Sequence, residues 1–262
     1  MTDERFSKRY GFEEVEPAEI TSRYEAPDGL RSVVPILAKE VGITPKPQRK
    51  IVCEVLRKRP DPNNWSEYPN IADEVADYLD NCDWYRVYDI IEAMYKGMYP
   101  QQAQKFEEEI NLFFLREGIG WKMEDGIISI RGSEAFEAAV EKADSILSET
   151  DRPTAQNEIK QSLSDLSRRP EPDITGAIQH ALAALECVAR DVSGKTDTLG
   201  QLAKRDDIFP KPLNIAVEKV WGFSSETGRH LLEGDDPDED EAELLVGLSS
   251  VLVSYIVKKV DE

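Results

Sequence analysis

Residues 174–194 read ITGAIQHALAALECVARDVSG, and this stretch decides the fold of the second half of the chain. Its apolar residues recur at steps of three and four, which places them along one side of an α-helix. They are Ile174, Ala177, Ile178, Ala181, Leu185, Val188, Ala189 and Val192. Gly194 is suited to end the helix, because glycine adopts the left-handed conformation of a helix terminus without steric cost. The stretch therefore predicts one long helix with a buried apolar face.

Polar residues on and after this helix mark the place where chemistry is expected. Glu186 and Arg190 are four residues apart, so they meet on the helix surface, and Asp191 follows directly. The segment WGFSSETGRHLLEG then brings Arg229 and His230, the latter one of only two histidines in the chain. Histidine titrates near neutral pH, and a guanidinium group matches phosphate oxygens. The candidate catalytic residues are therefore Arg229 and His230, with Arg190 nearby and Glu186 or Asp191 orienting them.

The same residues also fit a structural interpretation. Arg229 and His230 would then bind helix carbonyls, or pair with Glu186 and Asp191 inside a bundle. The second half would serve as an oligomerising or sensing module that binds a protein or nucleic acid partner. The other histidine, His180, lies off the apolar stripe, which favours a surface or interface role over catalysis.

Three segments of the second half resemble a known family. They are AIQHALAALECVARDVSGKTDTLGQLAK, VEKVWGFSSETGRHLLEG and ELLVGLSSVLVSYIVKK. Together they resemble the C-terminal module of abortive-infection proteins of the AbiJ type, which is similar to the HEPN superfamily of small helical bundles. The opening RFSKRYGFEEVEPAEI resembles the start of the N-terminal domain that precedes this module in such proteins.

The resemblance implies an antiphage effector with a metal-independent endoribonuclease site, built as a homodimer. It further implies an RNA substrate and a phage-derived trigger. Many HEPN nucleases carry an Arg and a His separated by somewhat more than a helical turn, whereas Arg229 and His230 are adjacent here. The non-catalytic interpretation therefore stays open beside the ribonuclease.

Composition and charge limit the remaining classes of function. The 262 residues carry a formal net charge of -20, so nucleic acid phosphates are attracted only where cations gather locally. Cys53, Cys82 and Cys187 are unclustered, which indicates reduced thiols in a cytoplasmic protein. The start lacks an apolar signal region, and no apolar run approaches membrane-spanning length. Motifs for nucleotide, zinc or serine hydrolase chemistry are missing, so no cofactor and no metal are expected.

A mainly α-helical protein of two domains is expected, residues 1–149 and 150–262, divided at SETDRP. The first domain is a set of helices closed by a β-hairpin near 120–131, because GWKMEDGIISIRG alternates around Asp125-Gly126, a dipeptide suited to a type I′ turn. Helices closed by a hairpin are compatible with a winged-helix arrangement, and equally with a plain cap on the domain. The second domain is the HEPN-like bundle.

Positive charge gathers in one segment of the first domain. The candidate nucleic-acid-binding residues are Arg49, Lys50, Arg57, Lys58 and Arg59, with Lys46 before them and Glu54 as the sole acid among them. This run is compatible with contact to a nucleic acid or a phage component, whereas a solvated helix face is the commoner meaning of such a run. The aromatic stretch of Trp84, Tyr85, Tyr88 and Tyr95 offers base stacking, but its helical spacing with apolar residues favours a core.

The last helix is expected to bury an apolar face and to begin in an acidic segment. The predicted buried residues are Leu244, Leu245, Leu248, Val251, Leu252, Tyr255 and Ile256. Eight acids occupy the eleven residues 233–243. Acids stabilise the positive N-terminal end of a helix, so capping is the favoured interpretation, with repulsion of RNA or docking of a basic partner as alternatives.

Overall fold

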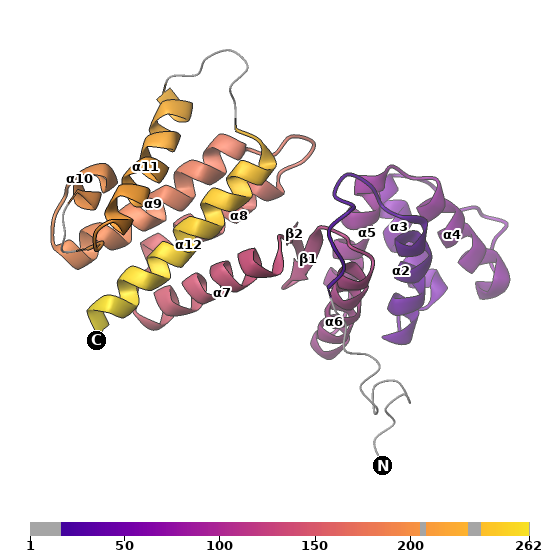
Figure 1. The fold of residues 1–262 in the computed structure, drawn as a ribbon. Coiled ribbons are helices and arrows are strands. Elements are labelled where there is room, and N and C mark those ends of the chain that lie inside the picture. The colour runs from indigo at the N-terminus through magenta and orange to yellow at the C-terminus, as the bar shows by residue number, and fades with distance from the viewer. Residues whose placement is uncertain (1–16, 205–207, 230–236, 262) are drawn as a thin grey trace. The chain divides into compact units, whose positions relative to one another are not determined.

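The computed structural model of the protein describes residues 17–204, 208–229 and 237–261, apart from the side chains of 224–229 and 261. The chain divides into two compact units, residues 1–131 and 132–262. Helices dominate both units, as the sequence predicted (Figure 1). None of the helices in the described ranges combines the length and the apolar character needed to span a bilayer.

The first unit consists of helices followed by one hairpin (Figure 1). Its elements are α2 (Asp28–Glu40), α3 (Pro45–Leu56), η1 (Glu67–Ile71), α4 (Ala72–Asp80), α5 (Trp84–Lys96), α6 (Pro100–Arg116), β1 (Trp121–Glu124) and β2 (Ile127–Ile130). The α2 helix packs against α3, α4, α5 and α6. Its buried side chains Leu30, Val34 and Leu37 therefore lie in the core of this unit.

The predicted hairpin is confirmed. Strands β1 and β2 pair antiparallel, with Trp121 opposite Ile130 and Glu124 opposite Ile127. Asp125 and Gly126 have φ angles of 51° and 77°, the positive values that a type I′ turn requires at both central positions. Asn111 on α6 holds β1 in place, because its amide group both donates to the Met123 carbonyl (2.8 Å) and accepts from the Met123 amide (2.7 Å).

Tyr88 confirms that the aromatic helix α5 contributes to the core. Its ring lies 6.1 Å from that of Phe114 and 5.9 Å from that of Trp121, and its buried hydroxyl donates to the Glu25 carbonyl. Burial raises the pKa of the Tyr88 phenol well above its usual value. Tyr85 is 43% exposed, so not every aromatic residue of this helix is buried.

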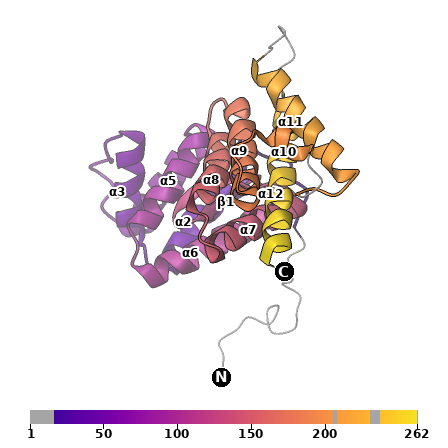
Figure 2. The same cartoon turned by 90° about the vertical axis from the view of Figure 1, so that its left-hand side faces the viewer.

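The second unit is entirely helical in the described residues (Figure 2). Its elements are α7 (Glu134–Glu149), α8 (Pro153–Ser167), α9 (Ile174–Ser193), α10 (Leu199–Ala203), α11 (Leu213–Arg229) and α12 (Glu239–Asp261). The α9 helix contacts α8, α10, α11 and α12, so it is the centre of the unit. The expectation that residues 174–194 organise this half of the chain is confirmed.

Both ends of α9 are formed as the sequence predicts. Gly194 has a φ of 64° in the left-handed region, and the Asp173 carboxylate accepts a hydrogen bond from the Gly176 amide at the start. Six of the eight predicted stripe residues are buried, while Ile174 and Val192 are half-buried near the two ends. The periodicity therefore identified the buried face correctly.

The α7 helix belongs by its packing to the second unit. Ser133 caps it as expected, with its hydroxyl accepting from the Phe136 amide, and the helix packs along α12. The chain therefore divides into its two compact units between Arg131 and Gly132, one helix before the boundary predicted at 149–150.

The predicted buried face of α12 is wrong at two positions. Leu244 is 66% exposed and Val251 is 51% exposed, because the helix turns Val246, Val253 and Val257 inward instead. The capping role expected for the acidic segment is confirmed for its described part. The Asp238 carboxylate accepts from the Glu241 amide, and the Glu241 carboxylate accepts from the Asp238 amide.

Candidate functional site

The two leading candidates for catalysis, Arg229 and His230, come at the end of the α11 sequence and directly after it. Arg229 is the last residue of that helix, but its side chain lies outside the described residues. His230 lies outside them altogether. The pairing of these two residues with Glu186, Arg190 or Asp191 therefore stays a prediction.

Glu186 and Arg190 meet as predicted and hold the connection between α9 and α10. Their side chains form an ion pair of 2.7 Å. The second Glu186 oxygen accepts from the Leu199 amide at 2.7 Å, and Arg190 Nε donates to the Asp197 carbonyl at 2.9 Å. The Glu186 carboxylate thus lies at the N-terminal end of α10, where the positive end of the helix dipole stabilises a negative charge. These contacts give both residues a structural task.

Asp191 points to a different partner. Its carboxylate pairs with Arg152 Nε at 2.9 Å, and Arg152 is the residue that precedes α8. The structure therefore brings Glu186 and Arg190 together but joins Asp191 to the turn between α7 and α8. The three candidate residues on α9 do not converge on one point.

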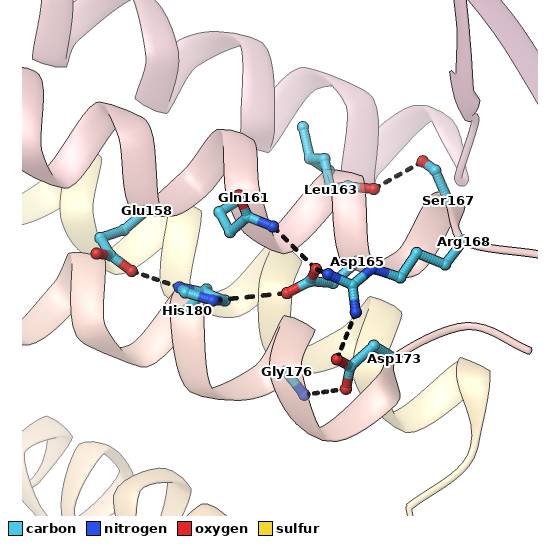
Figure 3. Close-up of polar contacts among 9 residues, drawn as sticks. All are labelled: Glu158, Gln161, Leu163, Asp165, Ser167, Arg168, Asp173, Gly176 and His180. Carbon is cyan, nitrogen blue, oxygen red and sulfur yellow. Dashed lines mark hydrogen bonds and ion pairs between the residues drawn. The ribbon is translucent and has the colours of Figure 1, made fainter.

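His180 lies in a polar cluster between α8 and α9 that the sequence analysis did not find (Figure 3). Its Nδ1 is 2.6 Å from Glu158 Oε2, and its Nε2 is 3.6 Å from Asp165 Oδ2. Glu158 and Asp165 are seven residues apart on α8, which places them on the same side of that helix. The imidazole therefore lies between two carboxylates, with 38% of its side chain exposed.

Asp165 is the buried member of this His180 cluster, with only 2% of its side chain exposed. One of its oxygens accepts from Gln161 Nε2 at 2.9 Å and pairs with Arg168 at 3.0 Å. Arg168 pairs with Asp173 at 2.9 Å through its other terminal nitrogen (Figure 3). Because Asp173 is the N-cap of α9, the cluster connects the end of α8 to the start of α9.

The charge of the His180 cluster decides what it can bind. Glu158, Asp165 and Asp173 supply three carboxylates, against the guanidinium of Arg168 and the imidazole. Three negative groups beside one permanent cation repel a phosphate. The geometry therefore suits a clamp that fixes α8 against α9, and it does not suit an RNA phosphate.

The five basic candidates of the first unit do not share one role. Arg49 points inward, where it donates to the Asn64 carbonyl at 2.7 Å and pairs with Glu74 at 3.0 Å. Lys50, Arg57, Lys58 and Arg59 are exposed. The Lys58 ammonium lies 5.0 Å from the centre of the Tyr78 ring, within cation–π range.

The three cysteines are free, and burial raises the pKa of each thiol. A raised pKa lowers the fraction of thiolate at neutral pH, which makes a cysteine a poor nucleophile. Within the described ranges, no three His, Cys, Asp or Glu side chains are arranged to hold a metal ion.

The protein is α-helical and has two units. The first unit is closed by a hairpin, and the second consists only of helices in its described parts. A family model described as AbiJ N-terminal domain 4 matches residues 4–145, more than half of the 262 residues, and the chain belongs to this family. The match makes it an abortive-infection-related protein. Searches of curated proteins and of solved structures each gave no significant match.

Proposed function

We propose that this protein is an antiphage effector of abortive infection whose second unit cleaves RNA without a bound metal ion. Membership of the AbiJ family is the observation that carries the proposal. The helical second unit, with α9 at its centre, supports a HEPN-like bundle. The protein acts in the cytoplasm, where both RNA and a phage-derived trigger are present.

His230 and Arg229 are the residues proposed to act on RNA. The imidazole transfers a proton at the ribose 2′-hydroxyl or at the leaving oxygen, and the guanidinium stabilises the charge that grows on the phosphate. Arg229 is the last residue of α11, a helix packed on α9, and His230 is the next residue in the sequence. In a homodimer, the Arg229-His230 pairs of both copies would line one shared RNA-binding groove.

The His180 cluster supplies a matched control for this proposal. It contains the only other histidine, and its three carboxylates disfavour a phosphate. Loss of His180 should therefore leave RNA cleavage in place, whereas loss of His230 should abolish it.

The test uses purified full-length protein with tRNA or total RNA in the presence of a chelator. We expect cleavage that Arg229→Ala and His230→Ala each reduce by about 100-fold or more, the usual contribution of a general acid or base. His180→Gln, checked by circular dichroism for its fold, should cleave as the wild type does. Absence of chelator-resistant cleavage by the wild type would contradict the proposal.

A non-catalytic oligomerisation module is the second candidate function, favoured by a groove between α7 and α12. The groove has a volume of about 460 Å³ and is lined mainly by apolar side chains, including Phe136, Leu244, Leu248 and Val251. Leu244 and Val251 are more than half exposed, which is costly for a helix face unless a partner covers it.

The charges of α12 support a second copy of the chain as the proposed occupant. Asp240 lies at the N-terminal end of the groove, and the exposed Lys258 lies in the last turn of the helix. Antiparallel pairing of two α12 helices about Leu248 would bring Asp240 of each copy close to Lys258 of the other. Light scattering should then show a dimer that Leu248→Asp dissociates, with Ile215→Asp on the exposed side of α11 as control. A wild type that stays monomeric would contradict this candidate.

A further inference from the structure

Trp65 is the most exposed large apolar side chain among the described residues, with 83% of its surface accessible. It lies in the connection between α3 and α4, two helices that pack together in the first unit (Figure 1). Tryptophan is large and apolar, so leaving it in water forgoes the favourable free energy of burial. The Trp65 indole is therefore available to stack on a ligand.

The connection that carries Trp65 is fixed by a buried carboxylate. Glu74, with 6% of its side chain exposed, accepts from the Asp61 amide at 2.7 Å, from Asn64 Nδ2 at 3.1 Å and from Arg49 at 3.0 Å. Arg49 in turn donates to the Asn64 carbonyl at 2.7 Å. The residue directly before Trp65 is thus held by two side chains, so the backbone that carries the indole is fixed.

Exposed lysines lie close to this part of the chain. The Lys46 amide donates to Glu67 Oε1 at 3.3 Å, and Arg49 donates to the Asn64 carbonyl. Because Lys46 and Arg49 are both in the N-terminal half of α3, residues 64–67 lie beside that half of the helix. The side chains of Lys46 and Lys50 are exposed there. Tyr68, which is 50% exposed, has the Lys39 ammonium 4.7 Å from its ring centre.

Acids also lie near this surface, and three of them make local contacts. Glu54 pairs with Lys50 at 3.9 Å, and Glu67 accepts from the first turn of α3. An Asp61 carboxylate oxygen accepts from the Asn63 amide at 2.8 Å. In a chain of net charge -20, this region keeps exposed cations next to exposed aromatic rings.

We propose that the Trp65 surface, formed by Trp65, Tyr68, Lys39, Lys46 and Lys50, binds single-stranded nucleic acid. A base stacks on the indole, and the ammonium groups pair with the phosphates on either side. Stacking of bases on aromatic rings beside a positive surface is how proteins bind single strands without reading their sequence. A duplex keeps its bases stacked on one another, so it offers the indole no free face.

The exposed cations Arg57, Lys58 and Arg59 come after the C-terminal end of α3 and are not part of the Trp65 surface. Arg49 takes no part in the contact, since its guanidinium group is bound to Glu74 and Asn64. The inference concerns the first unit only, and it is independent of the ribonuclease proposed for the second.

The test measures the fluorescence anisotropy of a labelled oligothymidylate about 20 nucleotides long, which exceeds the site size of one such module. DNA lacks the 2′-hydroxyl, so the result does not depend on RNA cleavage. Trp65→Ala should weaken binding by roughly 5- to 150-fold, the effect of losing one stacked base. Tyr99→Ala is the matched control, because Tyr99 is 80% exposed on the same unit and is not one of the five residues proposed to form this surface.

The salt dependence tests the contribution of the cations. Between about 50 mM and about 200 mM salt, Lys46→Ala and Lys50→Ala should each reduce the slope of log affinity against log salt by about 0.7, the value for one phosphate contact on a single strand. Binding should also quench tryptophan fluorescence in the wild type more than in Trp65→Phe. Equal affinities of Trp65→Ala and Tyr99→Ala, or no binding by the wild type at low salt, would overturn the proposal. Tighter binding of a duplex of the same length would do so as well.

Discussion

At the residue scale, Glu74 has the clearest energetic role in the described residues. Burial alone raises the pKa of this carboxyl group. The hydrogen bonds from the Asp61 amide, Asn64 and Arg49, together with the Arg49 charge, outweigh burial and bring its pKa below the usual value. Glu74 therefore stabilises the fold in its ionised form.

Glu74→Gln removes this charge and should destabilise the protein at neutral pH by about 1–3 kcal/mol, since it leaves buried hydrogen-bonding groups poorly matched. Chemical denaturation gives the free energy of unfolding for the wild type and the variant. Asp73→Asn, an exposed carboxyl on the same helix, is the control and should change little. A loss of similar size in both variants would contradict the assignment.

The pH dependence follows from the same pKa shift. A carboxyl whose pKa is lower in the folded state contributes stability above its unfolded pKa of about 4.3, and this contribution is lost as pH falls through the folded value. The difference in melting temperature between wild type and Glu74→Gln should therefore be largest near neutral pH and shrink below about pH 4. A difference that stays constant down to that pH would show that the charge is not responsible.

At the element scale, the hairpin depends on one glycine. Gly126 has a φ of 77°, and a Cβ atom there would lie 2.2 Å from the Tyr95 ring. Gly126→Ala should cost at least about 1 kcal/mol, because both the backbone conformation and the contact with Tyr95 become unfavourable. Gly97→Ala is the control, since its nearest contact would be an ordinary 3.5 Å. Hydrogen exchange of the β1 and β2 amides would detect the loss of the hairpin.

Elements set by short-range patterns were predicted well from the sequence. The α9 helix follows from its apolar spacing with Gly194 as its stop, and the hairpin follows from Asp125 and Gly126. The inner face of α12 was predicted less well, because apolar residues lie on more than one side of that helix. Which side is buried depends on α7 and α9, and helical spacing alone does not contain that information.

Side-chain partners that lie far apart in the sequence were not predicted. Arg49 looked like part of a positive surface, but its partner Glu74 comes 25 residues later. His180 looked like a lone surface residue, and its partners Glu158 and Asp165 are on a neighbouring helix. Trp65 gave no signal, since its exposure results from a connection that Glu74 fixes.

At the scale of the whole molecule, the division into two units predicts which fragments fold. Residues 132–262 contain α7 together with its packing partner α12, whereas residues 150–262 lack α7 and would leave part of α12 bare. We expect the longer fragment to unfold in one cooperative transition and the shorter one to be unstable or to aggregate. Calorimetry and circular dichroism distinguish the two outcomes, and equally stable fragments would instead favour a boundary at 149–150.

The contact between α7 and α12 also determines when the apolar side of α7 is covered during synthesis on the ribosome. The α7 helix is the first of its unit to be synthesised and α12 is the last, so the apolar side of α7 stays uncovered on the nascent chain until translation passes α12. A chain that stops before α12 therefore leaves the apolar side of α7 without its packing partner.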